Sequence, residues 1–152
     1  MHLGTYLALT ASAEQQLVTA FDQVAQTHHN EPDVYQTCGQ LAGWSRENLA
    51  VMQPSAAFYE APTSQEPERR ASPLFEWPRS GSVELLRDLQ NLWLLASQVH
   101  MTRLVLSKGA QALHDDALAL ACLARNGYTK RQLSWLLGQL KEFAPQTLAV
   151  AV

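Results

Sequence analysis

The sequence has few charges, no basic cluster and no long hydrophobic run, and each shortage excludes a class of protein. Asp, Glu, Lys and Arg make up 16% of the 152 residues, and the formal net charge is -3. Without a lysine- and arginine-rich block, the electrostatic attraction that dominates nucleic-acid binding is missing. The longest strongly apolar stretch, residues 92–96, is far shorter than the roughly 20 residues of a membrane-spanning helix. We therefore expect no nucleic-acid partner and no membrane span.

Cysteine is also scarce. Cys38 and Cys122 lie far apart in the chain, inside helical patterns. This usage is typical of a reducing compartment, with both thiols acting as small core residues, and a disulfide between them is the alternative. Residues 1–5 lack the positive segment and apolar core of a signal peptide. These features predict a cytoplasmic protein.

Proline is concentrated in one region. Five of the seven prolines fall between residues 54 and 78, and the other two, Pro32 and Pro145, lie at the edges of helical patterns. Since proline inside a helix costs about 3 kcal/mol, its absence elsewhere permits long helices. The sequence thus predicts helices over residues 5–29, 31–53, 82–113 and 115–143. A crossover over residues 54–81 and an apolar, β-prone tail over residues 146–152 complete the chain.

Apolar side chains recur every three or four positions in these segments, as in amphipathic helices. The start of the first helix is open, because residues 12–15 also read as a capping box. Asn30 is the expected N-cap of the second helix and Ser82 that of the third, while residues 114–116 provide the break before the fourth. The inward-facing residues of the third helix are expected to be Leu85, Leu89, Leu92, Ala96, Val99, Arg103 and Leu106. For the fourth helix they are expected to be Leu120, Ala121, Ala124, Tyr128, Trp135, Leu136 and Leu140.

The connections between the helices predict the topology. A link of about two residues between the first and second helices requires an antiparallel hairpin. A long crossover allows the second and third helices to run parallel. With 152 residues, one domain spanning residues 1–152 is expected, large enough to be stable without metal or disulfide.

In helix number, helix length and loop order, residues 5–143 resemble the ferritin-like superfamily. The resemblance implies a four-helix bundle whose core holds two irons through glutamates and Glu-x-x-His pairs. This chain contains no Glu-x-x-His, and Ser45 and Asn48 stand where the second helix should supply ligands. The resemblance therefore implies the fold with a degenerate metal site.

Glu14 is the acidic residue that falls on an inward stripe, and two interpretations are open for it. It could bind a single Fe, Mn or Zn ion together with His100 and His28, since carboxylate and imidazole suit these metals. Alternatively it pairs with Arg46, Arg103 or Arg125, because structural ion pairs are commoner than active sites. A polar core network rebuilt from a metal site is then expected from Glu14, His100, Ser45, Asn48, Arg103 and Arg125.

No nucleophile, phosphate-loop or zinc-ribbon pattern is present, so no catalytic residue and no cofactor are predicted. The low charge and surplus of apolar residues instead favour a non-enzymatic bundle that works through self-association, as a homodimer or a subunit of a larger assembly. The tail over residues 146–152 is a candidate contact with a protein partner. A divergent ferritin-like metalloprotein with one metal ion is the alternative.

Overall fold

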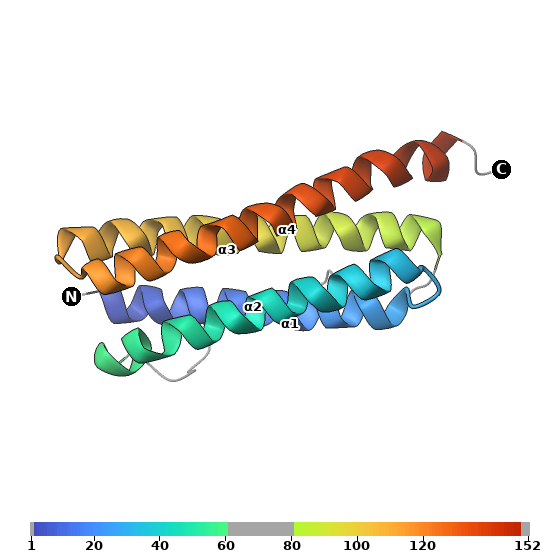
Figure 1. Ribbon diagram of the computed structural model, residues 1–152. Coiled ribbons are helices and arrows are strands. Elements are labelled where there is room, and N and C mark those ends of the chain that lie inside the picture. The colour runs from blue at the N-terminus through green and yellow to red at the C-terminus, as the bar shows by residue number, and fades with distance from the viewer. Residues whose placement is uncertain (1, 61–80, 150–152) are drawn as a thin grey trace.

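The computed structural model describes residues 2–60 and 81–149, and this part of the chain forms four long helices without a strand (Figure 1). The helices are α1 (Leu3–Thr27), α2 (Pro32–Phe58), α3 (Ser82–Ala112) and α4 (Asp116–Ala149). The prediction of an all-α fold with four helices in this order is confirmed.

The four helices lie side by side as two hairpins (Figure 1). α1 packs on α2 and on α3, α3 packs extensively on α4, and the contact between α2 and α4 is smaller. α2 ends at the end of the bundle where α1 begins, whereas α3 begins at the opposite end, so α2 and α3 run in the same direction. Of the predicted crossover, residues 61–80 lie outside the described residues.

Several predicted helix ends are wrong. α1 begins at Leu3 and passes straight through the capping-box sequence. α2 continues through Pro54 to Phe58, and α4 continues through Pro145 to Ala149, so residues 146–149 of the expected tail are helical. Each proline lies four residues from the end of its helix, where losing one backbone hydrogen bond is cheaper than in mid-helix.

The helix caps also differ by one residue from expectation. Glu31, and not Asn30, is the N-cap of α2, with Pro32 in the first turn as predicted. Gly81, and not Ser82, precedes α3 with a φ of 126°, which favours glycine. The side chain of Glu31 makes no hydrogen bond to the start of α2.

The turn between α3 and α4 is closed by hydrogen bonds at both helix ends. His114 adopts a left-handed φ of 56°, and the backbone N–H of Asp115 donates to the carbonyl of Ala110 at 2.9 Å. This is the hydrogen-bond pattern of a Schellman C-cap. The carboxylate of Asp115 then accepts from the backbone N–H of Leu118 at 3.0 Å, which makes it the N-cap of α4. The predicted break at residues 114–116 is confirmed.

Two apolar clusters fill the interior. The larger contains residues from all four helices, including Phe21, Leu41, Leu92 and Leu136. The smaller lies toward the end where α1 begins and includes Leu7, Leu106 and Leu118. The predicted inward residues of the third helix are all buried.

The predicted inward face of α4 is wrong in part: Leu136 is buried and Trp135 and Leu140 pack against the larger cluster, as expected. Leu120 is 65% exposed and Ala124 is also exposed, whereas the buried residues are Leu118, Cys122, Thr129, Gln132, Leu136 and Thr147. Half of these are polar, while leucines also occupy the outward side of the helix. Because α4 is apolar on both sides, its hydrophobic pattern does not identify the buried one.

Candidate functional site

A buried ion pair lies at the centre of the bundle. The guanidinium of Arg103 on α3 donates through Nη2 to Oε2 of Glu14 on α1 at 2.6 Å. Glu14 is 2% exposed and Arg103 is 1% exposed. The other carboxylate oxygen, Oε1, accepts from the amide of Asn48 on α2 at 2.9 Å. Burial raises the pKa of Glu14, and Arg103 and Asn48 oppose the rise by stabilising the charged form.

Further donors of this cluster bond to α4 and α2, while the buried Nε of Arg103 has no hydrogen-bond partner in the described part of the chain. Arg103 donates through Nη1 to the hydroxyl of Thr129 at 2.5 Å. Arg125 donates through Nε to Oδ1 of Asn48 at 2.5 Å and through Nη2 to the carboxylate of Glu47 at 3.2 Å. Its guanidinium also lies over the ring of Tyr128, 3.9 Å from the centroid. The two arginines thus tie α1, α2, α3 and α4 together.

Gln132 on α4 adds a second link to α2. Its amide donates to the backbone carbonyl of Leu41 at 3.0 Å and to the hydroxyl of Ser45 at 2.8 Å. Sequence reasoning missed Thr129 and Gln132. Their spacing could have identified them as inward-facing. Steps of three and four residues connect Cys122, Arg125, Thr129, Gln132 and Leu136.

We call these residues the polar layer, because they separate the two apolar clusters of the core. The structure brings together Glu14, Ser45, Asn48, Arg103 and Arg125. The buried Nδ1 of His100, the sixth residue of the expected network, has no hydrogen-bond partner within the described residues. Glu14 and Glu47 balance the charges of Arg103 and Arg125. The polar layer consists of Glu14, Ser45, Asn48, Arg103, Arg125, Thr129 and Gln132.

Of the two histidines suggested as metal ligands, His28 lies far from this carboxylate. His28 is fourteen residues beyond Glu14, about 21 Å along α1 at 1.5 Å per residue, and its Nε2 bonds to Asp88 at 2.6 Å. His100 is half-buried, and burial lowers its pKa, with Arg103 and Lys130 adding to the effect. Among residues 2–60 and 81–149, three or more His, Cys, Asp or Glu side chains nowhere form a group able to hold a metal.

Both cysteines are free, buried thiols rather than a disulfide. Burial raises the pKa of Cys38 to about 12 and that of Cys122 to about 11. Both values keep the sulfur protonated at neutral pH, which matches the predicted role of small core residues and not that of nucleophiles.

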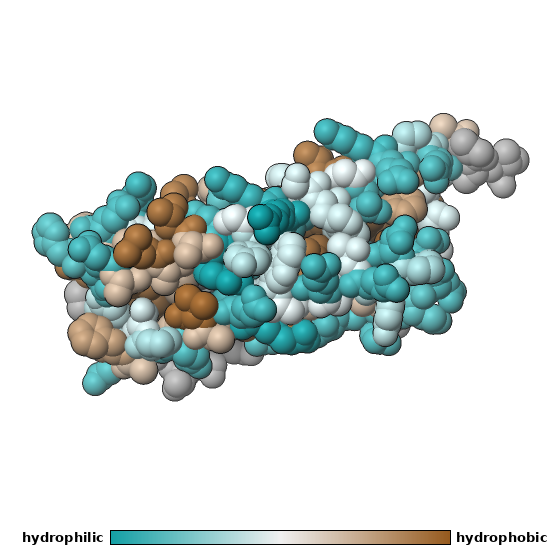
Figure 2. Space-filling model, in the orientation of Figure 1, coloured by the Kyte–Doolittle hydropathy of each residue, from teal (hydrophilic) through white to brown (hydrophobic). Residues whose placement is uncertain are grey.

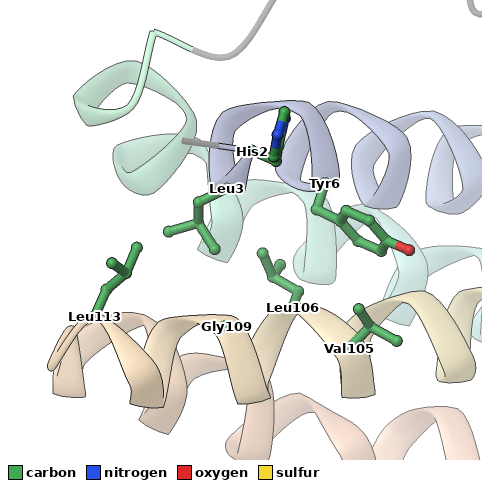
Figure 3. Close-up of a pocket in the computed structure, with 7 residues that line it drawn as sticks. All are labelled: His2, Leu3, Tyr6, Val105, Leu106, Gly109 and Leu113. Carbon is green, nitrogen blue, oxygen red and sulfur yellow. The ribbon is translucent and has the colours of Figure 1, made fainter.

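An apolar cavity of about 290 Å³ lies near the start of α1 (Figure 3). Leu3 points from α1 toward Leu106 on α3, Val105 lines the cavity from the same helix, and Leu113 lines it from the residue after that helix. Gly109 lets the helices approach, because a Cβ there would lie 3.2 Å from Cδ1 of Leu3. Leucine and valine side chains form most of the lining, and His2 and Tyr6 complete it.

Comparison with known proteins finds no matching family model, no matching curated protein and no matching solved structure. Within the described residues, none of the helices combines the length and hydropathy needed to cross a membrane.

Proposed function

We propose that this chain is a ferritin-like helical bundle that has replaced metal chemistry with a polar layer and acts through self-association, as a homodimer or as an assembly subunit in the cytoplasm. The parallel course of α2 and α3 supports the ferritin-like connectivity (Figure 1). The observation that carries the function is an apolar surface at one end of the molecule.

The position of Arg103 supports the loss of metal binding. A ferritin-like bundle neutralises its inward carboxylates with metal ions, and here a guanidinium lies 2.6 Å from the carboxylate of Glu14. Asn48 holds the second oxygen of the same carboxylate. A cation would have to displace both groups, leaving Arg103 as a buried charge without a partner.

The apolar surface lies where α4 begins and α2 ends. Figure 2 shows hydrophobic side chains gathered over this end of the bundle. Phe58 is 77% exposed and Leu120 and Leu123 are about two-thirds exposed, and Val51 and Leu113 are also exposed. Exposed apolar side chains gathered at one end of a molecule are a feature of surfaces that contact another protein.

Sedimentation velocity over a hundredfold range of concentration tests this proposal. We expect a mass-action shift from monomer to dimer or larger species, which Phe58→Ser weakens by at least tenfold in Kd. Tyr35→Ser is the matched control, because Tyr35 is another exposed aromatic residue of α2 at the opposite end of the bundle. A wild-type chain that stays monomeric throughout the range contradicts self-association.

A further inference from the structure

Another cavity lies at the end of the bundle where α1 and α4 end and α2 and α3 begin (Figure 1). Its volume is about 380 Å³, and residues at all four helix ends line it. Leu85 and Phe143 are the apolar part of the lining, and the other lining residues are polar or glycine. We call this space the end cavity. It lies at the opposite end of the molecule from the apolar surface assigned to self-association, so the two features are separate.

His28 lines the end cavity as a buried imidazole in a fixed orientation. It is 5% exposed, and its Nε2 bonds to Oδ2 of Asp88 at 2.6 Å. Because a carboxylate only accepts hydrogen bonds, Nε2 carries the proton of the neutral ring and Nδ1 is the acceptor. The pair therefore places a neutral acceptor in the wall of the cavity and a carboxylate directly behind it.

Thr147 on α4 contributes a buried hydroxyl to the same cavity. It is 6% exposed, and within residues 2–60 and 81–149 its hydroxyl makes no hydrogen bond to another residue. A buried hydroxyl without a partner is costly, so folded proteins usually supply one, as a protein group, a water or a ligand. Since Thr147 lines the end cavity, an occupant of the cavity is the available partner.

The helix ends around the cavity favour a cation. The C-terminal ends of α1 and α4 carry partial negative charge, and in the described part of the chain neither has a basic residue in its last turn. His29 covers one carbonyl of α1, that of Gln26, at 3.0 Å. The N-terminal ends of α2 and α3 carry partial positive charge, and each has an acidic residue in its first turn, Asp33 and Glu84. The positive ends are thus matched by opposite charges and the negative ends are not.

The lining residues add negative charge. Of the ten residues that line the end cavity, Glu31 is the one with a permanent charge, and Asp88 is a second carboxylate behind His28. Lysine and arginine are absent from these ten described residues. Just outside the cavity, Lys141 and Glu142 are adjacent in the chain and have opposite charges. The electrostatic field inside the cavity therefore has the sign that attracts cations.

We infer that the end cavity binds a small organic cation, namely a protonated amine with a short apolar body. The ammonium group bonds to the carboxylate of Glu31 and to the neutral acceptors of His28 and Thr147. The apolar body lies against Leu85 and Phe143, and the ring of Phe143 also attracts cations through its face. An anion would meet the same carboxylate and the negative helix ends. This binding site goes beyond the proposed self-association and does not depend on it.

Three ligands of similar size and different charge test the inference: benzylamine, which is protonated at neutral pH, benzyl alcohol and benzoate. Each is titrated into the full isotope-labelled chain and followed by amide chemical shifts. Benzylamine is expected to bind with a Kd of about 1 mM or lower, a usual affinity for a ligand of about eight heavy atoms. Benzyl alcohol and benzoate should bind at least tenfold more weakly, because neither offers a positive charge. The shifts should centre on residues 27–31, 81–85 and 143–147.

Two variants and a control locate the site. Glu31→Gln is expected to weaken benzylamine binding at least tenfold through loss of the charge, and it spares α2, because the Glu31 side chain makes no cap hydrogen bond. Thr147→Val keeps the shape without the hydroxyl and should weaken binding by about three- to tenfold. Glu142→Gln is the matched control, because Glu142 is an exposed carboxylate at the same end that does not line the cavity. Equal midpoints of urea denaturation show that each variant is folded.

The inference is overturned if benzyl alcohol or benzoate binds as tightly as benzylamine, or if none of the three ligands causes saturable shifts. It is also overturned if Glu31→Gln has no more effect than Glu142→Gln. Shifts centred on Leu3, Gly109 and Leu113 would assign the ligand to the apolar cavity at the other end and count against the end cavity in the same way. Sedimentation without ligand measures self-association separately, so either proposal can fail while the other stands.

Discussion

Replacing Arg103 by methionine removes the cation on which the polar layer depends. The guanidinium is 1% exposed and bonds to Glu14 and Thr129. At an effective dielectric constant of about 20, two charges about 4 Å apart attract by about 4 kcal/mol. Breaking a buried ion pair by removing one member costs about 3–5 kcal/mol. We therefore expect Arg103→Met to lower the free energy of unfolding by about 4 kcal/mol at neutral pH, measured by urea denaturation.

The pH dependence of this loss identifies its cause. Burial raises the pKa of Glu14, so the folded state holds the proton more tightly than the unfolded state. The stability that this group contributes is complete below its ordinary pKa of 4.5 and is lost as pH rises through the folded value. Without Arg103 the folded pKa rises further. The cost of Arg103→Met should therefore be small near pH 4.5 and grow toward pH 7.5.

The matched control is Arg46→Met, the same substitution in an exposed pair. Arg46 bonds to Asp22, and its side chain is 54% exposed. Exposed ion pairs contribute about 0–1 kcal/mol, so this variant should remain close to the wild type. A loss below about 1 kcal/mol for Arg103→Met, or an equal loss at both pH values, would refute the electrostatic role assigned to the polar layer.

Three further substitutions, each measured by urea or thermal denaturation, test the apolar core, the cap of α4 and an exposed glycine of α2. Leu136→Ala should cost about 2–5 kcal/mol, because the side chain is fully buried in the larger cluster, and a loss below 1 kcal/mol would contradict that packing. Asp115→Ala should cost about 1 kcal/mol through loss of the α4 cap. The hydrogen bond from Tyr59 lowers the pKa of Asp115 in the folded state. The stability difference between the wild type and Asp115→Ala should therefore be complete above pH 3.8 and decrease as pH falls through the folded-state pKa. Gly39→Ala should stabilise α2 by up to about 1 kcal/mol, since a Cβ there meets nothing within 4 Å, and destabilisation would show that the site is not open.

Periodicity predicts the buried face of the first three helices well, and in α3 it does so although exposed apolar residues also occupy the outer side. Leu7, Phe21, Val34, Leu41 and Leu89 are all buried as the three- and four-residue spacing indicates. The same pattern made Glu14 and Arg103 recognisable, because a charged residue within an apolar stripe is unusual. Their direct contact was one of the alternatives that the sequence left open.

In the fourth helix, hydrophobic periodicity does not identify the buried side. Two of its leucines, Leu118 and Leu120, lie on opposite sides of the helix, and of these two only Leu118 is buried. The buried side also carries Thr129 and Gln132, which a hydrophobic pattern assigns to solvent. Their burial depends on partners in α2 and α3, and local sequence contains no information about which partners tertiary packing will supply.

The predicted ends of α2 and α4 were wrong for a related reason. Proline predicts an end through the backbone hydrogen bond that it removes, and Pro54 and Pro145 remove one bond each near ends that fray in any case. The packing of the surrounding turns decides whether the helix continues. Proline content alone therefore predicted the end of the second helix to within a few residues and not its exact position.

The apolar outer faces of α3 and α4 raise the question of how each helix selects its inward side. Burial of leucines favours either side, so the choice falls to groups that are satisfied in one orientation. Arg103 finds Glu14, and Gln132 finds Ser45, when the observed faces point inward. Turning α4 to bury Leu123 and Leu137 would withdraw Thr129 and Gln132 from their partners.

This reasoning yields a prediction that separates stability from uniqueness. The double variant Glu14→Leu and Arg103→Met replaces the central ion pair by apolar residues of similar size, a change that often preserves or raises stability. If the polar layer fixes helix rotation, the variant should unfold at a urea concentration near that of the wild type and yet give broadened or doubled amide resonances. Sharp, single resonances with native nuclear Overhauser contacts would show instead that the apolar clusters orient α3 and α4 by themselves. In that case Arg103 would serve only to neutralise the buried carboxylate of Glu14, and the ion pair would have no role in selecting the fold.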